Sequence, residues 1–154
     1  SFLKRNKLTL VVHSSKLPKD RGFAPLTYKV LQNSNIIFFS LFQVVKKVDS
    51  GNIFLRTKLK LNGTELYDEL RKKQAETILN LIKKFLFKYP LIKSSVQSGK
   101  TNYNKRRYPR DSELDINKNI KSQFNLMRVS DNEKFPIFFY HKSVKYILKI
   151  FKDL

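Results

Sequence analysis

Two neighbouring stretches in the first half of the chain have the polarity pattern of paired β-strands. Residues 36–48 form a nearly continuous apolar run rich in Phe and Val, and residues 52–61 alternate between aliphatic and mostly basic side chains. A turn sequence at residues 49–51 separates them. Strand-forming runs on either side of a turn are typical of a β-hairpin. We therefore predict an antiparallel pair with one packed and one basic face, preceded by a half-buried strand over residues 7–13.

The pattern after this hairpin is that of a long amphipathic helix. Apolar side chains recur at helical spacing between Leu66 and Phe85, acidic residues cluster in the first turns, and Pro90 ends the pattern. Carboxylates favour the start of a helix because its N-terminus carries a positive partial charge. Thr64 is the predicted N-cap. Upstream of the hairpin, residues 26–31 are predicted to form another strand.

The apolar period changes midway through residues 134–151. Pro136 is followed by an aromatic and β-branched run that favours a strand, whereas the apolar residues of 144–151 recur at helical spacing. Residues 124–127 are predicted to be the partner strand across a polar turn. Together these segments predict a hairpin closed by a short C-terminal helix, with residues 91–96 as the first strand of the same sheet.

This C-terminal arrangement resembles the ribosomal small-subunit protein 19 family. Members of that family carry a Phe-Asn-Val-like strand, a polar turn, an Ile-Pro-Val-Phe strand and then a helix. Phe124 and Asn125 match the first strand, residues 134–138 match the end of the turn and the second strand, and the spacing from the proline to Phe151 is kept. Residues 110–114 look like the family's Arg-Arg-Ser-x-Ile segment.

The resemblance implies an α+β fold. Residues 75–154 would form an RNA-binding core made of a helix plus a small antiparallel sheet with a short C-terminal helix. Residues 1–74 would form a β-rich N-terminal extension. The resemblance further implies a structural protein of a mitochondrial small ribosomal subunit, placed in the subunit head, with small-subunit rRNA and ribosomal small-subunit protein 13 as partners.

The charge of the chain agrees with a polyanionic partner. The chain has 32 Lys plus Arg against 12 Asp plus Glu, a net charge of +20. Such a field favours binding to nucleic acid or, second, to an anionic membrane surface. Between Lys83 and Arg110 there is no acidic residue, and residues 100–110 interleave tyrosines with cations. Cations neutralise phosphates while tyrosines stack on unpaired bases, so this loop is a predicted RNA contact.

The predicted RNA-binding residues are cationic or aromatic side chains of this loop, of the segment before it and of the C-terminal hairpin: Lys93, Lys100, Tyr103, Lys105, Arg106, Arg107, Arg110, Arg128, Lys134, His141, Lys142, Lys145, Tyr146 and Lys149.

No set of residues with catalytic spacing stands out in the sequence. The chain has no cysteine, and its two histidines, His13 and His141, lie in no metal-ligand spacing. We therefore predict that the chain is not an enzyme and uses no cofactor, catalytic metal or small-molecule substrate. A metal-dependent nuclease built on Asp111 and Asp115 remains an alternative.

The location and the second functional hypothesis follow from composition. Residues with G/C-rich codons are scarce, which suggests an A/T-rich coding genome such as that of an organelle, and we predict a mitochondrial location. The longest apolar run, residues 36–45, is too short for a transmembrane helix. The alternative function is a peripheral subunit of an organellar membrane complex that docks through this run.

Overall fold

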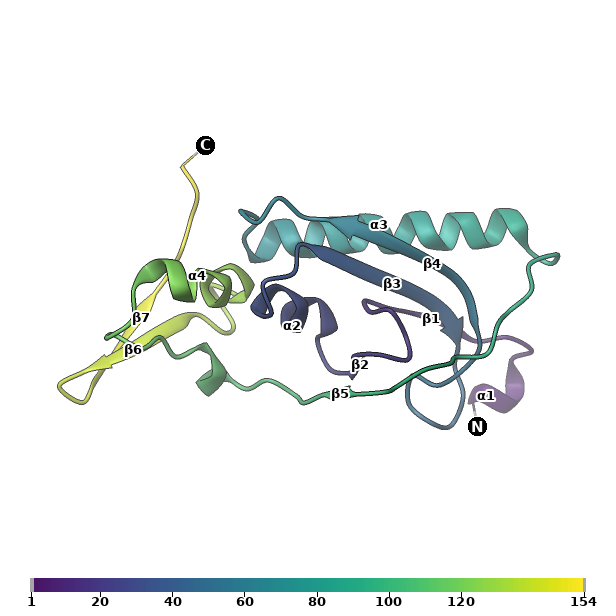
Figure 1. Cartoon of the computed structure of the whole chain (residues 1–154), viewed down its shortest axis with the longest axis horizontal. Helices are drawn as coiled ribbons and strands as arrows, with labels where there is room; N and C mark the ends of the chain where they lie inside the picture. The colour runs from purple at the N-terminus through teal and green to yellow at the C-terminus, as the bar shows by residue number, and fades with distance from the viewer. Residues whose placement is uncertain (1, 154) are drawn as a thin grey trace.

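The computed structural model describes residues 2–153 and has a mixed α+β fold, as predicted (Figure 1). Its elements, in chain order, are α1 (Phe2–Arg5), β1 (Leu10–His13), β2 (Arg21–Gly22), α2 (Pro25–Leu31), β3 (Ile36–Gln43), β4 (Ile53–Lys60), α3 (Tyr67–Lys88), β5 (Tyr103–Asn104), the 3₁₀ helix η1 (Pro109–Ser112), α4 (Ile120–Val129), β6 (Ile137–His141) and β7 (Val144–Leu148).

The main sheet is antiparallel, with strand order β1-β3-β4. β3 and β4 form the predicted hairpin, in which Ile37 pairs with Leu59 and Leu41 with Leu55. The buried side chains of β3 belong to the main hydrophobic core, where Phe39 is completely buried. Burial of these apolar side chains is the main force that holds the sheet in place.

The predicted long helix is confirmed as α3, which runs along the sheet in Figure 1. Leu70, Leu81 and Phe85 bury its inner face in the same core as β3. Its N-cap is Leu66 rather than the predicted Thr64, because the carboxylate of Glu69 reaches back and accepts the Leu66 N–H at 2.8 Å. Among the described helices, none has the length and apolar character needed to cross a membrane.

Two segments predicted to be strands are helices. Residues 26–31 lie in α2, because Pro25 occupies the first turn, where a helix tolerates proline, and one face of the helix is buried. Residues 124–127 lie in α4, whose N-cap Asn119 accepts the Ser122 N–H at 2.8 Å. The proline in the first turn of α2 and the Asn119 cap of α4 therefore outweigh the strand propensity of these short apolar runs.

The predicted C-terminal helix is also wrong. Residues 144–148 form β7, which pairs antiparallel with β6 so that Phe138 lies opposite Ile147. Lys142 and Ser143 both have positive φ angles, 46° and 62°, as a two-residue hairpin turn requires. A C-terminal hairpin therefore exists, but its strands are β6 and β7 and it contains no helix.

Residues 91–96 do not join the C-terminal hairpin. Their only described pairing is an isolated bridge between Ser95 and Ile53 at the start of β4. The predicted division into residues 1–74 and 75–154 has its boundary inside α3, and as a division of domains it stays a prediction.

A buried ion pair joins the start of α3 to α4. Arg128 Nη2 lies 3.2 Å from Glu65 Oε2, and both side chains are almost completely buried. Burial on its own would raise the pKa of Glu65, but the N–H groups of Asn62 and Gly63 and the ammonium of Lys73 outweigh it and lower that pKa to about 2. Burial lowers the pKa of Arg128, yet a guanidinium starts so high that it stays charged.

The Glu65 carboxylate should make the fold sensitive to acid. Its folded pKa lies below the unfolded value of 4.5, so its stabilisation is complete above about pH 5 and is lost as the pH falls toward 2. The shift corresponds to at most about 3 kcal/mol. In urea unfolding between pH 7 and pH 2.5, Glu65→Gln should lower stability at pH 7 and flatten the acid dependence. Glu133→Gln, at an exposed ion pair with Lys149, is the control and should change neither.

Candidate functional site

His13 is the last residue of β1, and a hydrogen bond fixes the orientation of its ring. Its Nε2 lies 2.8 Å from the backbone carbonyl oxygen of Asp20, and its side chain is only 12% exposed. A carbonyl oxygen only accepts hydrogen bonds, so Nε2 carries the hydrogen and donates it. Within residues 2–153 no hydrogen bond engages Nδ1. The neutral imidazole therefore presents Nδ1 as a proton acceptor.

Asp49 brings a carboxylate to the same ring. Its Oδ2 lies 3.8 Å from His13 Nε2 and accepts the Gly22 N–H at 2.9 Å. The side chain of Asp49 is 17% exposed, so little solvent screens the pair. The negative charge of Asp49 therefore lies beside the Nε2 edge of the ring, on the side away from Nδ1.

The approach of Asp49 to His13 does not follow from the strand register. Leu10 pairs with Gln43, so the loop of residues 44–52 leaves the sheet at the opposite end of β1 from His13, roughly 10 Å away along the strand. The loop must therefore fold back over the sheet to reach His13. Asp49 has a φ angle of 49°, an unfavourable left-handed conformation for a residue with a side chain.

Asp20 is fixed by its own contacts. Its N–H donates to Asn102 Oδ1 at 2.9 Å, and its carboxylate accepts from Asn102 Nδ2 at 2.9 Å and pairs with Lys29 at 2.8 Å. Burial on its own would raise the pKa of Asp20, but these partners outweigh it and hold that pKa below its usual value. The Asp20 carbonyl is thus kept in place toward His13.

Residues 95–104, which we call the strap, connect the parts of this site. Figure 1 shows the segment after α3 returning along the side of the molecule opposite that helix and passing β2 as β5. In the strap, Ser95 pairs with Ile53, Asn102 holds Asp20, and β5 pairs in parallel with β2. The side chain of Gln97 contacts the loop that carries Asp49. The site therefore combines three segments that are distant in sequence.

Four of the predicted RNA-binding residues meet in one basic hollow. Lys105, Arg106, Arg107 and Arg110 line it together with tyrosines 28 and 108 and Asp111. The guanidinium groups of Arg106 and Arg110 lie 6.0 Å and 5.4 Å from the ring centre of Tyr108. The hollow begins directly after β5, so the strap links it to the His13 site.

The other predicted RNA-binding residues are scattered. Arg128 is used in the internal pair with Glu65, and Tyr103 lies in the strap with its hydroxyl 3.4 Å from Arg21 Nη1. Exposed residues elsewhere are Lys93 before the strap, Lys100 within it, and, in or near the C-terminal hairpin, Lys134, His141, Lys142, Lys145, Tyr146 and Lys149. RNA binding by these residues stays a prediction.

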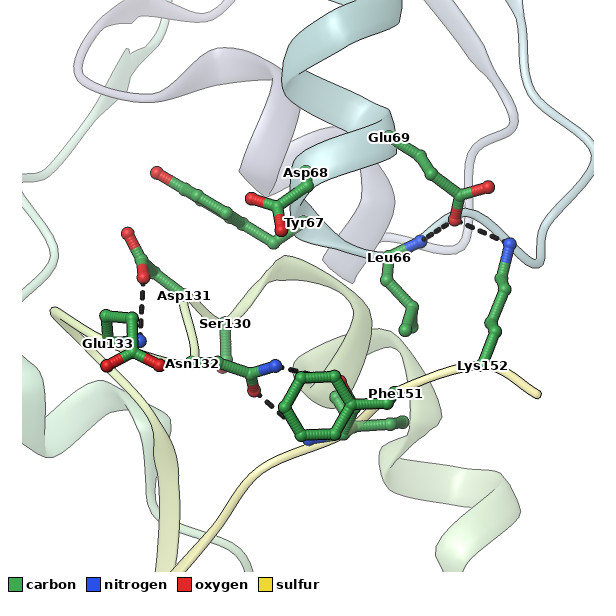
Figure 2. Close-up of a pocket in the computed structure, with 11 residues that line it drawn as sticks. Leu66, Tyr67, Asp68, Glu69, Ser130, Asp131, Asn132, Glu133, Phe151 and Lys152 are labelled. Atoms are coloured by element: carbon green, nitrogen blue, oxygen red, sulfur yellow. Dashed lines mark hydrogen bonds and ion pairs between the residues drawn. The ribbon is translucent and has the colours of Figure 1, made fainter. Parts of the chain in front are cut away.

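A second hollow lies between the start of α3, the turn after α4 and the C-terminal segment (Figure 2). Its polar groups mostly bond to one another. Lys152 pairs with Glu69 at 2.5 Å, and the Asn132 side chain makes two hydrogen bonds to the backbone of Ile150. The hydrogen bond from Lys152 is the main cause that lowers the pKa of Glu69. These contacts tie the C-terminal segment to α3 and suggest no chemistry.

The described part of the chain contains no group of three or more His, Asp or Glu side chains that could hold a metal ion. Asp111, one of the two carboxylates of the nuclease alternative, accepts the Tyr108 N–H at 2.6 Å. Asp115, the other, accepts the Asn117 N–H at 3.0 Å and pairs with Lys118.

Two curated relatives are methionyl-tRNA formyltransferases. The chain is 45% identical over 62 residues to that of Mycoplasmopsis pulmonis, an alignment that covers 40% of the chain and 22% of the relative. It is 36% identical over 90 residues to that of Lactobacillus gasseri, covering 55% and 29%. The chain thus spans less than a third of the length of these two relatives. No model of a known protein family matches it.

Three solved structures, two of them formyltransferases, share the fold. A methionyl-tRNA formyltransferase from Clostridium thermocellum matches with a TM-score of 0.79 at 22% identity, over 95% of this chain and 63% of that one. A sugar N-formyltransferase from a Shewanella species matches with a TM-score of 0.75 at 16% identity, over 99% and 64%. HypX from Aquifex aeolicus in complex with tetrahydrofolic acid matches with a TM-score of 0.73 at 15% identity, over 95% and 26%.

These likenesses overturn the ribosomal interpretation. The relatives are formyltransferases, which are enzymes, so the resemblance to ribosomal small-subunit protein 19, the structural ribosomal role and the prediction of a non-enzyme are wrong. The alternative of a membrane-complex subunit is wrong for the same reason. The predicted partners, rRNA and ribosomal small-subunit protein 13 without a small-molecule substrate, conflict with a related structure that holds tetrahydrofolic acid. The mitochondrial location stays a prediction.

The site is not visible in the sequence, because His13 has no apparent partner there and Asp49 stands within a turn sequence. The available signal was weak: a histidine at the end of a strand, followed by a loop with Pro18 and Gly22. Nothing local to either residue indicates that the loop of residues 44–52 folds back.

Gly22 should be required where β2 meets the strap. A Cβ at Gly22 would lie 2.7 Å from the carbonyl oxygen of Asn104, whereas a Cβ at Gly99 would meet nothing within 4 Å. Both glycines have positive φ angles, 88° and 106°, so alanine is strained at either position. Gly22→Ala should therefore destabilise the fold by about 1–3 kcal/mol more than Gly99→Ala in urea unfolding. If both variants lose the same free energy of unfolding, the strap backbone moves enough to accommodate a Cβ at Gly22.

Proposed function

We propose that this chain carries the proton-transfer groups of a formyltransferase that moves a formyl group from a tetrahydrofolate carrier to a primary amine. The observation that carries the proposal is the His13 imidazole, which donates Nε2–H to the Asp20 carbonyl beside the Asp49 carboxylate and leaves Nδ1 open. The likeness to methionyl-tRNA and sugar N-formyltransferases supports this reaction class.

The reaction requires a proton to change place. The amine nitrogen attacks the formyl carbon and forms the new C–N bond, and the bond between the formyl carbon and the carrier nitrogen breaks. The attacking nitrogen loses one proton and the carrier nitrogen gains one. His13 Nδ1 takes the proton from the attacking nitrogen and returns it to the departing one, as general acid–base catalysis requires. Asp49 stabilises the imidazolium between the two steps, while Nε2–H stays on the Asp20 carbonyl.

The charge of the chain favours methionyl-tRNA over an amino sugar as the acceptor. A net charge of +20 attracts a polyanion far more strongly than a small sugar. The basic hollow around Arg106 and Arg110 follows the strap directly, so a nucleic acid bound there would lie next to the segment that also holds the His13 site. Tyr108 offers a face for stacking beside these cations.

The reaction class is tested by following transfer of a labelled formyl group. The purified chain is mixed with a formylated tetrahydrofolate and either methionyl-tRNA or an amino sugar. We expect transfer to methionyl-tRNA, and a loss of roughly 10²-fold or more in kcat for His13→Gln because no group then accepts the proton. His141→Gln, at the exposed second histidine, should retain full activity. Absence of transfer to both acceptors, together with absence of tetrahydrofolate binding in calorimetry, would contradict the proposal.

The acceptor is tested by neutralising the basic hollow. Arg106→Gln combined with Arg110→Gln should raise KM for methionyl-tRNA by about 10-fold and reduce the slope of log affinity against log salt by about 2, with kcat unchanged. The matched control is Lys58→Gln with Lys60→Gln, two exposed cations on β4. If both pairs change KM equally, the hollow has no specific role. If an amino sugar is used with a lower KM than methionyl-tRNA, the acceptor is a sugar.

A further inference from the structure

Gln97 makes the side-chain contacts that join the strap to the loop of Asp49. Its Nε2 donates to the carbonyl oxygens of Asp49 at 2.9 Å and Gly51 at 2.8 Å. Its Oε1 accepts from Arg21 Nη2 at 2.7 Å. The Gln97 amide thus donates both N–H groups to the loop and accepts a hydrogen bond from β2. The same strand supplies the Gly22 N–H that binds Asp49.

The loop needs such an external hold. It folds back along β1, away from the end of the sheet where it begins, and its Asp49 has the unfavourable φ angle of 49°. The Gly51 backbone is pressed against Gln43, since a Cβ there would lie 1.8 Å from the Gln43 carbonyl oxygen. A strained conformation persists only where surrounding contacts determine it.

We propose that Gln97 is a positioning residue, which sets the Asp49 carboxylate between the Gly22 N–H and His13. The proposal rests on the proposed function in so far as Asp49 assists proton transfer. Gln97 touches the backbone of Asp49 on one side, and the Asp49 carboxylate accepts the Gly22 N–H on the other. Arg21 links the two contacts, because it donates a hydrogen bond to Gln97 and directly precedes Gly22 in the chain.

Two substitutions separate the contacts of Gln97. Gln97→Leu removes all three hydrogen bonds at similar size. Gln97→Glu keeps an oxygen for Arg21 but can no longer donate to the two carbonyl oxygens of the loop. Gln123→Leu is the matched control, because Gln123 also ties a loop, with hydrogen bonds to the backbone of Asp115 and Lys118, far from His13 in the sequence. Asp49→Ala gives the limit in which the carboxylate is absent.

The first measurement is amide hydrogen exchange at Gly22, whose N–H donates to the Asp49 carboxylate. It needs no substrate and no turnover. Both Gln97 variants should speed exchange at Gly22 by about 10-fold, close to the effect of Asp49→Ala, because the carboxylate moves away from this N–H. Gln123→Leu should leave Gly22 exchange as in the unmodified chain.

The second measurement is formyl transfer to methionyl-tRNA. Both Gln97 variants should lower kcat by about 10–100-fold and leave KM for methionyl-tRNA unchanged, because misplacing a catalytic group weakens the chemical step and not acceptor binding. A general loss of folding would instead lower the active fraction, which a urea unfolding curve detects.

The outcomes distinguish the two proposals. Unchanged Gly22 exchange in both Gln97 variants overturns the positioning role, whatever the activity. Faster exchange in Gln97→Leu but not in Gln97→Glu overturns it too, since Arg21 would then be the contact that matters. Faster exchange in both variants with unchanged kcat supports the positioning of Asp49 by Gln97. It also shows that Asp49 takes no part in the reaction, so the proposed role of Asp49 in proton transfer is wrong.

Discussion

The hydrogen bond from His13 Nε2 to the Asp20 carbonyl determines what the site can do. Because that oxygen can only accept, the ring is neutral with Nδ1 unprotonated, or it is fully protonated, and no other tautomer keeps the bond. The carboxylate of Asp49 lies 3.8 Å from the same Nε2 and so leaves Nδ1 free of competition. This division of roles between a carbonyl and a carboxylate makes an isolated histidine useful as a proton acceptor.

The regular elements of the fold could be predicted wherever the local signal and the tertiary environment agree. The hairpin of β3 and β4 and the long helix α3 are examples, since each has a clear polarity period and recognisable ends. The wrong predictions of helix and strand fall in short apolar runs, where one or two residues at the ends determine which element forms. Pro25 and Asn119 begin helices that the apolar pattern alone assigned to strands, and the turn at Lys142 and Ser143 turned an expected helix into a strand.

The candidate site was out of reach for a physical reason. His13 and Asp49 are connected by no shared element, and the strand register places their segments at opposite ends of β1. The strap, which lies more than forty residues further along the chain, holds the two segments through Asn102 and Gln97, beside the direct hydrogen bond from the Gly22 N–H to Asp49. The excess of positive charge led to the prediction of rRNA as a partner, because net charge describes possible partners and says nothing of fold or chemistry.

The wide spacing of the site segments has a consequence for the order of folding. Contacts within the β3–β4 hairpin and α3 are local and can form early, whereas those between the strap and residues 20–22 close a loop of some eighty residues and carry a larger entropy cost. The sheet can therefore be native while the strap is still detached. In that partly folded species Asp20 lacks its Asn102 contacts, so the carbonyl that orients His13 would be fixed only when the last cooperative unit assembles.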